Sequence, residues 1–378
     1  MKHNRFEKHP KKMFMIFLLG LLLFSAYGAE ILLSMTTQRE KISTEVRNIR
    51  LREYLPSAVK YVVPTDADMS NSDSLVKKEY RFEIDKDGYI YPSRIHDQPD
   101  LTIIFLGGST TQCLYVDENN RFPYLVGRLL EKNGKRVNSF NSSRSGNDSM
   151  HSNNILLNKG MALSPDVAVM MHNINDLNVL LYEGSYWNRN PSRSLIVVHR
   201  PSFYNGMKDI MKAAFPRLIN ELAELKVRVF GGLNIDNEFS HLRGKQLTMN
   251  KHEILRQFER SLSTFIGISR SHKIMPVLMT QANRFKDKPD EVIVNGWIVP
   301  KLNSLGIGYE ELKDTYDEMN NLVRRIGRIN EVQVIDLAKE VPQDSAYIYD
   351  YVHFNDNGSK YVAALISSQL ENSLGELK

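Results

Sequence analysis

The chain has 378 residues, a length that suits one large α/β domain with insertions. Its content of 42% apolar and 25% charged residues is that of a globular protein and excludes a disordered or fibrous chain. The net charge of +5 does not favour a nucleic-acid binder, because five Lys or Arg and one Glu lie in residues 1–12 and leave the remainder near neutral. The single cysteine, Cys113, excludes an intramolecular disulfide and a cysteine metal cluster.

The N-terminal segment combines a basic tail, residues 1–12, with an apolar stretch, residues 13–33. We interpret residues 13–33 as an uncleaved signal anchor that crosses the inner membrane once; the alternative is a cleaved signal peptide and a secreted protein. Because basic flanks stay in the cytoplasm, the tail is expected there and the rest of the chain on the periplasmic or extracellular side.

Two segments precede the expected main domain. Residues 34–78 are mostly polar and charged, with weak helical periodicity over 34–60, and are predicted to form a stalk that leaves the membrane. Residues 79–100 are predicted to form a small flap. Apolar and polar residues alternate over 79–92 around Asp87-Gly88, which is typical of a β-hairpin.

From residue 101 onward, apolar strands alternate with helical patterns. The predicted strands are residues 101–106, 136–141, 166–172, 274–280 and 332–338. The predicted helices are residues 121–134, 149–161, 250–270, 309–328 and 357–374. This alternation predicts a three-layer α/β/α sandwich over residues 101–378, with a doubly wound parallel five-stranded sheet. In such sheets, functional sites form beyond the carboxyl ends of the strands.

Two insertions, residues 182–249 and 281–308, interrupt this alternation and are long enough to form lids or small subdomains. They contain aromatic residues that could stack on a sugar ring or simply pack the insertions onto the domain: Tyr186, Trp187, Phe203, Tyr204 and Trp297. Trp187 and Trp297 are our candidates for substrate binding.

Polar side chains follow several of the predicted strands. Ser109 comes directly after the first strand and two glycines, and Asp350 precedes His353 by three residues just before the last helix. A serine hydroxyl becomes a nucleophile when a histidine takes its proton, and a carboxylate holds that imidazole in one tautomer. Ser109, His353 and Asp350 are therefore the predicted catalytic group.

An acyl-transfer site also needs donors for the oxyanion that forms during attack. The candidates are the backbone N–H groups of Ser109 and Gly146 and the side-chain amide of Asn175. Each residue of this set, taken alone, is better explained as a helix cap, a turn former or a structural polar residue. It is their joint occurrence at predicted strand and loop ends that indicates a site.

The set resembles the SGNH, or GDSL-type, hydrolases, and among them a membrane-anchored bacterial branch. In this family Ser, Gly, Asn and His occur in this order in four sequence blocks. The matching segments are FLGGSTT at 105–111, NSSRSG at 141–146, NIND at 173–176 and DYVH at 350–353. The resemblance implies a flavodoxin-like three-layer fold, a nucleophile at Ser109, oxyanion donors at Gly146 and Asn175, no metal and no organic cofactor.

Three positions depart from the family pattern. Gly108 replaces the aspartate of the Gly-Asp-Ser block, and Ser143 and Asn173 stand where the second and third blocks carry a glycine. The Asp-x-x-His block has no departure.

Other sites are not supported by the sequence. The dinucleotide-binding and P-loop glycine patterns are absent. A metal site could be imagined from His151, His172 and Asp176, but these residues lie in different predicted elements and no HExxH motif occurs. We expect His172 to line the cleft as a substrate-binding candidate, His151 to lie at the surface, and Cys113 to pack against the sheet.

These observations predict a membrane-anchored serine esterase that removes O-acyl groups, most of all O-acetyl groups, from a cell-surface carbohydrate. The first alternative is an O-acyltransferase that uses the same triad to modify a surface polysaccharide. The second is an inactive glycan-binding or scaffold protein, suggested by the altered residues at positions 108, 143 and 173. The expected partners are the acylated carbohydrate and the membrane, with no nucleic acid.

Overall fold

The computed structural model describes residues 9–36, 45–131, 134–199, 201–215, 217–219, 221–222 and 238–376. The chain divides into two compact units. The first contains Met1–Arg47 and Val198–Phe215, and the second contains Asn48–Val197 and Pro216–Lys378. Most of the predicted tail and the part of the predicted stalk at residues 37–44 lie outside the described residues.

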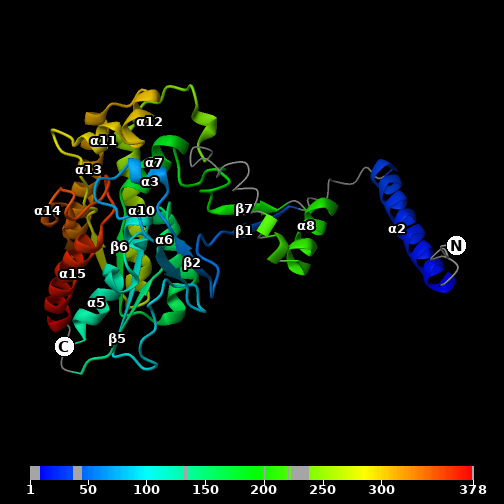
Figure 1. Ribbon diagram of the computed structural model, residues 1–378, viewed down its shortest axis with the longest axis horizontal. Helices are drawn as coiled ribbons and strands as arrows, with labels where there is room; N and C mark the ends of the chain where they lie inside the picture. The colour runs from blue at the N-terminus through cyan, green and yellow to red at the C-terminus, as the bar shows by residue number, and fades with distance from the viewer. Residues whose placement is uncertain are drawn as a thin grey trace. The chain divides into compact units, whose positions relative to one another are not determined.

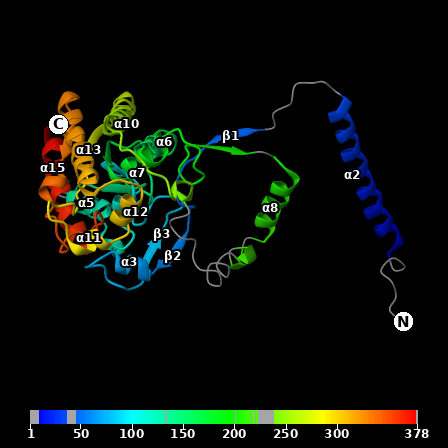
Figure 2. The same ribbon diagram turned by 90° about the horizontal axis from the view of Figure 1, so that it is seen from above.

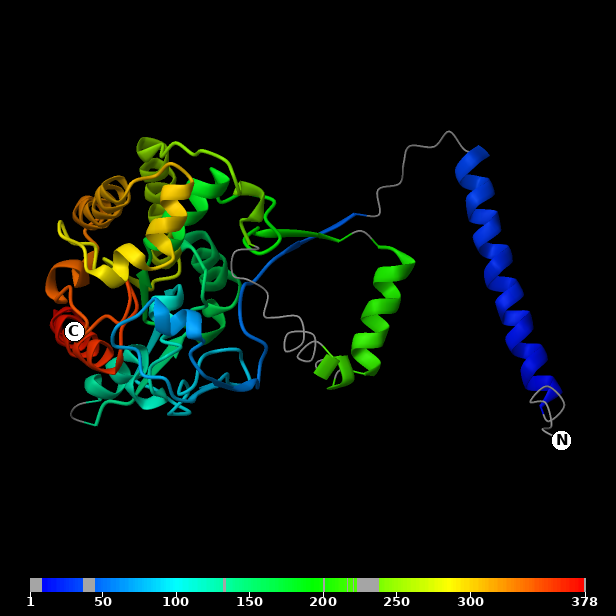
Figure 3. The same ribbon diagram turned by 45° about the horizontal axis from the view of Figure 1, so that its top comes forward.

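The described part of the first unit includes the helices α2 (Pro10–Thr36) and α8 (Phe203–Ala214). Helix α2, drawn in Figure 3 as one continuous helix, contains a stretch of 24 residues, Pro10–Leu33, with a mean hydropathy of 2.1. A helix of 24 residues is about 36 Å long, enough to cross the hydrocarbon core of a bilayer. Among the described residues, α2 is the one helix with this length and apolar character, which fits a membrane anchor or a signal sequence.

The second unit is built on a parallel five-stranded sheet in the order β5-β4-β6-β8-β9. Figure 1 labels its strands β5 and β6 among the surrounding helices. Its strands are β4 (Leu101–Gly107), β5 (Val137–Asn141), β6 (Val167–Met171), β8 (Met275–Met279) and β9 (Gln333–Ile335). All five predicted strands are confirmed. The chain enters at β4, moves outward to β5 and returns to the other side of β4, so the order reverses between β4 and β6. Ligands bind at such a reversal in doubly wound sheets.

Successive apolar residues of these strands point to opposite faces of the sheet, so both faces have to be covered. Helices provide the cover on each side. Ile104 and Leu106 pack into one core together with helices α6, α7, α10 and α13. Ile103 and Phe105 pack into another core with α5 and α15, which lie side by side in Figure 2. The predicted three-layer α/β/α sandwich is therefore confirmed.

The helices of these layers have the following bounds: α5 (Phe122–Leu130), α6 (Ser149–Asn158), α7 (Ile174–Glu183), α10 (Lys251–Ser271), α13 (Tyr309–Ile329) and α15 (Asp356–Glu376). The shorter helices are α3 (Asp66–Ser70), α4 (Ser109–Gln112), α11 (Glu291–Asn295), α12 (Ile298–Ser304) and α14 (Leu337–Glu340). Single 3-10 turns occur at Glu118–Asn120, Gly160–Leu163 and Ser240–Leu242. The predicted end of the helix at 121–134 falls partly on residues outside the described ones.

The segments predicted as stalk and flap are more ordered than the sequence suggested. Strand β2 (Val59–Val62), in the expected stalk, pairs antiparallel with β3 (Tyr80–Glu83). The turn around Asp87-Gly88 forms, and Ile84 and Ile90 pair across it in an antiparallel bridge, as expected for a hairpin. The sequence analysis did not predict that β3 also pairs with β2, a segment about twenty residues earlier in the chain.

Buried Arg121 connects residues 79–92 to the rest of the second unit. Its guanidinium donates to the carbonyls of Arg81 and Tyr91 at 2.7 and 2.8 Å. The side chain is only 1% exposed and lies over the ring of Phe82. Residues 79–92 are therefore part of the packed structure, because an arginine buried without these carbonyls would be strongly destabilising.

The two predicted insertions differ from each other. The insertion at 281–308 folds into α11 and α12 and belongs entirely to the second unit. The insertion at 182–249 contains strand β7 (Ile196–His199) and helix α8, and its residues 198–215 belong to the first unit. Strand β7 forms a two-stranded sheet with β1 (Val46–Ile49). Residues 223–237 of this insertion lie outside the described residues.

Candidate active site

Ser109 lies where strand β4 passes into helix α4, at the carboxyl edge of the sheet. Two glycines are required for this turn. A Cβ at Gly107 would come within 2.2 Å of the hydroxyl of Thr111, and a Cβ at Gly108 would come within 2.1 Å of the Nδ2 of Asn175. A side chain at position 108 would therefore require Asn175 to move.

His353 and Asp350 lie in a tight turn just before α15. The Oδ1 atom of Asp350 accepts the backbone N–H groups of Val352 and His353 at 2.9 and 2.8 Å. The N–H of Tyr349 donates to the carbonyl of His353 at 2.9 Å and closes the turn. The spacing of three residues thus places the carboxylate directly beside the imidazole.

The three residues of the predicted catalytic group form one hydrogen-bonded chain. The Nδ1 atom of His353 lies 2.6 Å from the Oδ2 of Asp350, and its Nε2 lies 2.7 Å from the Oγ of Ser109. With the Nδ1 proton donated to the carboxylate, Nε2 is left to accept the hydroxyl proton of Ser109. The side chain of His353 is 18% exposed and Ser109 is partly exposed, so a substrate can reach both.

Aromatic and charged neighbours hold the His353 turn in place. The ring of His353 stacks on Tyr349 at 5.7 Å and meets Tyr351 edge to face at 5.9 Å. Buried Arg284 donates its backbone N–H to the carbonyl of Tyr351 at 2.9 Å and binds both oxygens of Asp73 at 2.7 Å. The histidine therefore belongs to a turn with few alternative conformations.

Asn175 lies at the start of α7, beyond the end of β6 and next to Gly108. Its Nδ2 donates to the carbonyl of Asn147 at 2.9 Å. An amide nitrogen carries two hydrogens, and this contact uses one of them. The structure thus brings Asn175 to the backbone of the Ser109 turn on one side and to the Gly146-Asn147 loop on the other.

Gly146 has a φ of +76°, a conformation that side-chain-bearing residues rarely adopt. Its carbonyl accepts the Nη1 of Arg193, and a Cβ here would come within 2.8 Å of that guanidinium. Its N–H has no acceptor among the described residues. Arg52 supports the same loop, because it donates to the side-chain oxygen of Asn147 at 3.2 Å. Burial, together with the charges of Arg193 and Arg144, lowers the pKa of Arg52 to about 10.

Gln281, directly after β8, joins two parts of the site that the sequence did not connect. Its Nε2 donates to the hydroxyl of Thr110 at 2.7 Å, and its Oε1 accepts the N–H of Ile174 at 3.0 Å. Thr110 follows the serine and Ile174 precedes Asn175. A polar residue just after a predicted strand is the signal that could have indicated it, but residue 281 also begins the predicted insertion at 281–308.

A second polar group is buried beneath this edge of the sheet and corrects two expectations. His172, expected to line the cleft, is 3% exposed, and its Nε2 lies 2.7 Å from the Oγ of Ser152. His151, expected at the surface, is 1% exposed and pairs with Asp148 at 2.8 Å. Both side chains point into the protein because they satisfy buried groups on α6 and α7.

Asp176 is the centre of this buried group. It accepts hydrogen bonds from the hydroxyls of Tyr186, at 2.6 Å, and Ser149. Burial and the negative charge of Asp148 raise the pKa of Asp176 to about 7, whereas burial lowers the pKa of His172 to about 3. Tyr186, one of the aromatic residues considered for sugar stacking, is buried here and supports Asp176 instead.

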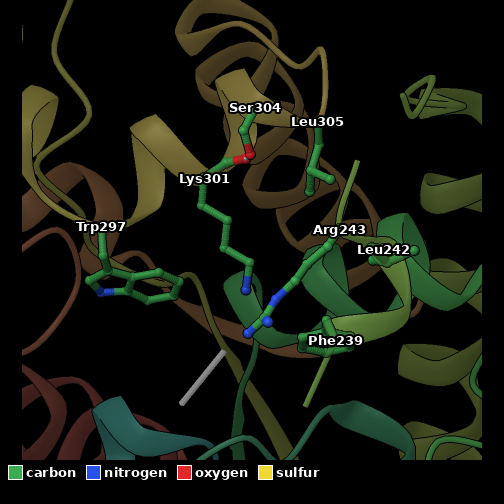
Figure 4. A pocket seen from close by; sticks show the side chains of 7 residues that line it. All are labelled: Phe239, Leu242, Arg243, Trp297, Lys301, Ser304 and Leu305. Atoms are coloured by element: carbon green, nitrogen blue, oxygen red, sulfur yellow. The ribbon is translucent and has the colours of Figure 1, made fainter. Parts of the chain in front are cut away.

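A pocket of about 270 Å³ opens near the His353 turn (Figure 4). The described residues that line it are Phe239, Leu242, Arg243, Trp297, Lys301, Ser304 and Leu305. The ring of Trp297 meets Tyr351 at 5.8 Å, and Tyr351 in turn meets His353. Phe239 lies under the guanidinium of Arg193, which binds Gly146. Tyr351 therefore connects the pocket to His353, and Arg193 connects it to Gly146.

The two tryptophans differ in their surroundings. Trp297 is 40% exposed and lines the pocket, with the Nζ of Lys301 5.5 Å from its ring. Trp187 is 67% exposed and contacts Tyr186 at its edge. Trp187 is not one of the residues that line the pocket.

No group of three or more His, Cys, Asp or Glu side chains within the described part of the chain is arranged to hold a metal ion. Cys113 is buried in the core that contains Phe105 and helices α5 and α15. Burial raises the pKa of its thiol to about 12. The expected packing of this residue against the sheet is confirmed.

Comparison with protein families gives a match to the GDSL-like Lipase/Acylhydrolase family over residues 105–361, more than half of the chain. No curated protein matches the sequence. Similar solved structures include an acylhydrolase from Bacteroides fragilis (13% identity, 74% of this chain and 90% of that chain, TM-score 0.39). An acetyl xylan esterase (15%, 71% and 99%, 0.39) and a lipase/acylhydrolase from Enterococcus faecalis (16%, 72% and 96%, 0.39) are similar to the same extent.

Proposed function

The chain belongs to the GDSL-like lipase/acylhydrolase family, and we propose that it is a membrane-anchored serine esterase that removes O-acyl groups, most of all O-acetyl groups, from a cell-surface carbohydrate. The observation that carries this proposal is the hydrogen-bonded chain from Ser109 through His353 to Asp350. These contacts match the requirements for activating a serine hydroxyl at neutral pH.

In the proposed reaction, the Oγ of Ser109 attacks the ester carbonyl while the Nε2 of His353 takes the hydroxyl proton. The tetrahedral intermediate collapses, the sugar oxygen leaves with the proton from His353, and the acyl group remains on Ser109. Water then attacks the acyl-serine carbonyl and gives a proton to the Nε2 of His353. The bond between the acyl carbon and the Oγ of Ser109 breaks, His353 returns the proton to Oγ, and the carboxylic acid is released. Asp350 holds the imidazole in one orientation and stabilises its charged form throughout.

The backbone N–H groups of Ser109 and Gly146 and the second amide hydrogen of Asn175 are the proposed oxyanion donors. The N–H of Gly146 has no acceptor among the described residues, and the amide of Asn175 lies against Gly108. Such fixed donors stabilise a developing negative charge strongly, because they need no reorganisation when it forms.

The pocket beside the His353 turn is the proposed binding site for a neighbouring sugar ring. Its volume of about 270 Å³ is near the lower end of ligand pockets and suits one ring of a longer chain. Trp297 offers an aromatic face, and Figure 4 shows the side chains of Lys301 and Arg243 entering the same pocket.

The N-terminal helix α2 is the proposed single-pass anchor. The basic residues of the tail would keep the N-terminus in the cytoplasm and place the second unit in the periplasm. A surface carbohydrate would then be within reach of the site.

The test is labelling of the full chain with a fluorophosphonate together with hydrolysis of p-nitrophenyl acetate. We expect one covalent adduct, located at Ser109 by peptide mass spectrometry, and turnover that the adduct abolishes. A folded protein that neither hydrolyses the ester nor reacts with the probe would contradict the proposal. Addition of acceptor oligosaccharide separates hydrolysis from transfer, since a transferase would release acylated sugar in place of acetate.

A further inference from the structure

Helix α8, Phe203–Ala214, carries an apolar face that no described residue covers. All of its residues whose exposure is described, Tyr204–Ala214, are exposed, with Tyr204 at 74% and Ile210 at 62%. An isolated helix of this length is marginally stable in water, and helices in proteins normally gain stability by burying an apolar face. Something outside the described residues therefore has to cover α8.

The sequence of α8 is strongly two-sided. Tyr204, Met207 and Met211 recur every three to four residues and so lie on one face, which Ile210 widens. Phe215, the residue that follows the helix, is exposed as well. Exposed contiguous apolar surfaces mark interaction sites with proteins or membranes.

The polar side of α8 carries charges in the pattern of a membrane-surface helix. Lys208 and Lys212 lie one turn apart and border the apolar face next to Tyr204 and Phe215, and Asp209 lies on the far side. Lysines at such a border bury their methylene stems and extend their ammonium groups toward phosphate headgroups. Aromatic and methionine side chains on one face with lysines at its edge are typical of helices that lie in the bilayer interface.

The chain brings α8 close to a membrane through covalent connections. Ten residue steps separate Thr36, the end of α2, from Val46, so these residues lie at most about 35 Å apart. Strand β1, which begins at Val46, pairs with β7, and β7 ends four residues before α8 begins. A tether of this length keeps α8 at a high effective concentration near any bilayer that α2 crosses.

We propose that α8 is a second membrane contact, which lies flat in the bilayer interface with Tyr204, Met207, Ile210 and Met211 facing the acyl chains. This proposal rests on α2 crossing the membrane and is independent of the reaction at Ser109. Two attachments, α2 and α8, would restrict the orientation of the chain at the membrane more than one attachment does.

The test uses nitroxide labels on the full chain in nanodiscs of phosphatidylethanolamine and phosphatidylglycerol. Met207→Cys places the label at the centre of the apolar face, and Asp209→Cys is the matched control on the opposite face of the same helix. Cys113 is buried and has a raised pKa, so the protein without an added cysteine measures background labelling. A label at Leu22→Cys in α2 gives the reference for a residue inside the bilayer.

We expect the ratio of oxygen to nickel-chelate accessibility to be about tenfold higher at position 207 than at 209, as for a helix half immersed in lipid. Equal access of the chelate to both positions would overturn the proposal. Protection of position 207 from both oxygen and the chelate would also overturn it, because this indicates packing on protein. Spin–spin broadening that disappears on addition of unlabelled protein would overturn it as well, because this indicates contact with a second copy. A label at Leu22 that lies in water would overturn the anchor and this proposal together, whereas loss of ester hydrolysis alone would leave it intact.

Discussion

Two groups of a serine, a histidine and an aspartate lie near the carboxyl edge of the same sheet. One consists of Ser109, His353 and Asp350, and the other of Ser152, His172 and Asp176. In both, the serine hydroxyl is 2.7 Å from a histidine Nε2. In the first, the histidine and the carboxylate are 2.6 Å apart, but in the second they are 3.5 Å apart, which is too long for a good hydrogen bond.

The two groups also differ in their access to water. The side chain of His353 is 18% exposed, whereas that of His172 is 1% exposed and Ser152 is 0% exposed. Burial lowers the pKa of His172 to about 3, so its imidazole stays neutral and cannot act as a base that becomes charged near neutral pH. Residue types therefore do not distinguish a reactive group from a structural one; accessibility and orientation do.

The largest expected difference between the groups comes from removing each serine hydroxyl. Ser109→Ala should lower kcat for p-nitrophenyl acetate by at least about a thousandfold, because the nucleophile is lost. Ser152→Ala should leave kcat within about twofold and lower the free energy of unfolding by about 1–3 kcal/mol, because the Nε2 of His172 loses its partner. Steady-state kinetics measures kcat, and urea unfolding measures the free energy of unfolding. Equal losses of kcat in the two variants would contradict the distinction between a reactive and a structural group.

The next largest effect is expected at the oxyanion donor. Asn175→Ala should lower kcat by about a hundredfold to a thousandfold, or about 2.7–4 kcal/mol, with little change in KM. Asn178, one turn further along α7, is the matched control because it lies on the same helix outside the site. Asn178→Ala should leave kcat nearly unchanged. An Asn175→Ala variant with normal kcat would remove Asn175 from the mechanism.

The buried group should be visible in the pH dependence of stability. His172 has a folded-state pKa of about 3, below its unfolded value, so it contributes stability above pH 6.5 that is lost as the pH falls toward 3. His172→Gln should therefore gain stability relative to the native protein by about 1.4 kcal/mol per pH unit on acidification from pH 6.5 to 4. Chemical unfolding at several pH values measures this slope.

Asp176 acts with the opposite sign. Its folded pKa of about 7 lies above the unfolded value, so its contribution is present below pH 3.8 and is lost as the pH rises toward 7. The two contributions offset each other in the native protein, and only the single variants separate them. His272→Gln, at an exposed histidine, is the control and should show no change of slope; the same slope for both variants would contradict the assignment of His172 as buried and neutral.

The smallest expected effect on kcat comes from replacing Gln281, which links the Ser109 turn to helix α7. Gln281 holds Thr110 of the Ser109 turn and Ile174 of helix α7, which also carries Asp176. Gln281→Ala should lower kcat about tenfold with KM unchanged, since a displacement of the serine and the oxyanion donor costs a few kcal/mol at most. Kinetics on p-nitrophenyl acetate give both constants.

Thr280→Val is the matched control for Gln281. Thr280 precedes it and donates to Asp336 at 2.9 Å, away from the serine. This variant should lose stability without loss of kcat. Gln281→Glu, which keeps the acceptor for the N–H of Ile174, should recover part of the lost kcat. A Gln281→Ala variant that changes only stability would show that the residue has no positioning role.

Most of the sheet was predictable from the sequence because buried strands are continuous apolar runs. The predicted strand at 166–172 is observed as Val167–Met171, and that at 274–280 as Met275–Met279. The positions of Ser109 and Asn175 follow from the same runs, since each residue comes just after a strand. The spacing of Asp350 and His353 was also sufficient, because three residues are enough to form their turn locally.

The remaining features depend on contacts between distant segments, which no local pattern encodes. The pairing of β2 with β3, the burial of His172, and the bridge that Gln281 makes between Thr110 and Ile174 are of this kind. A histidine after a strand has the same sequence signal whether it faces a cleft or a neighbouring helix. The sequence by itself determined which residues reach the edge of the sheet, and only the tertiary structure decided which of them meet water, because burial is a property of the whole packed chain.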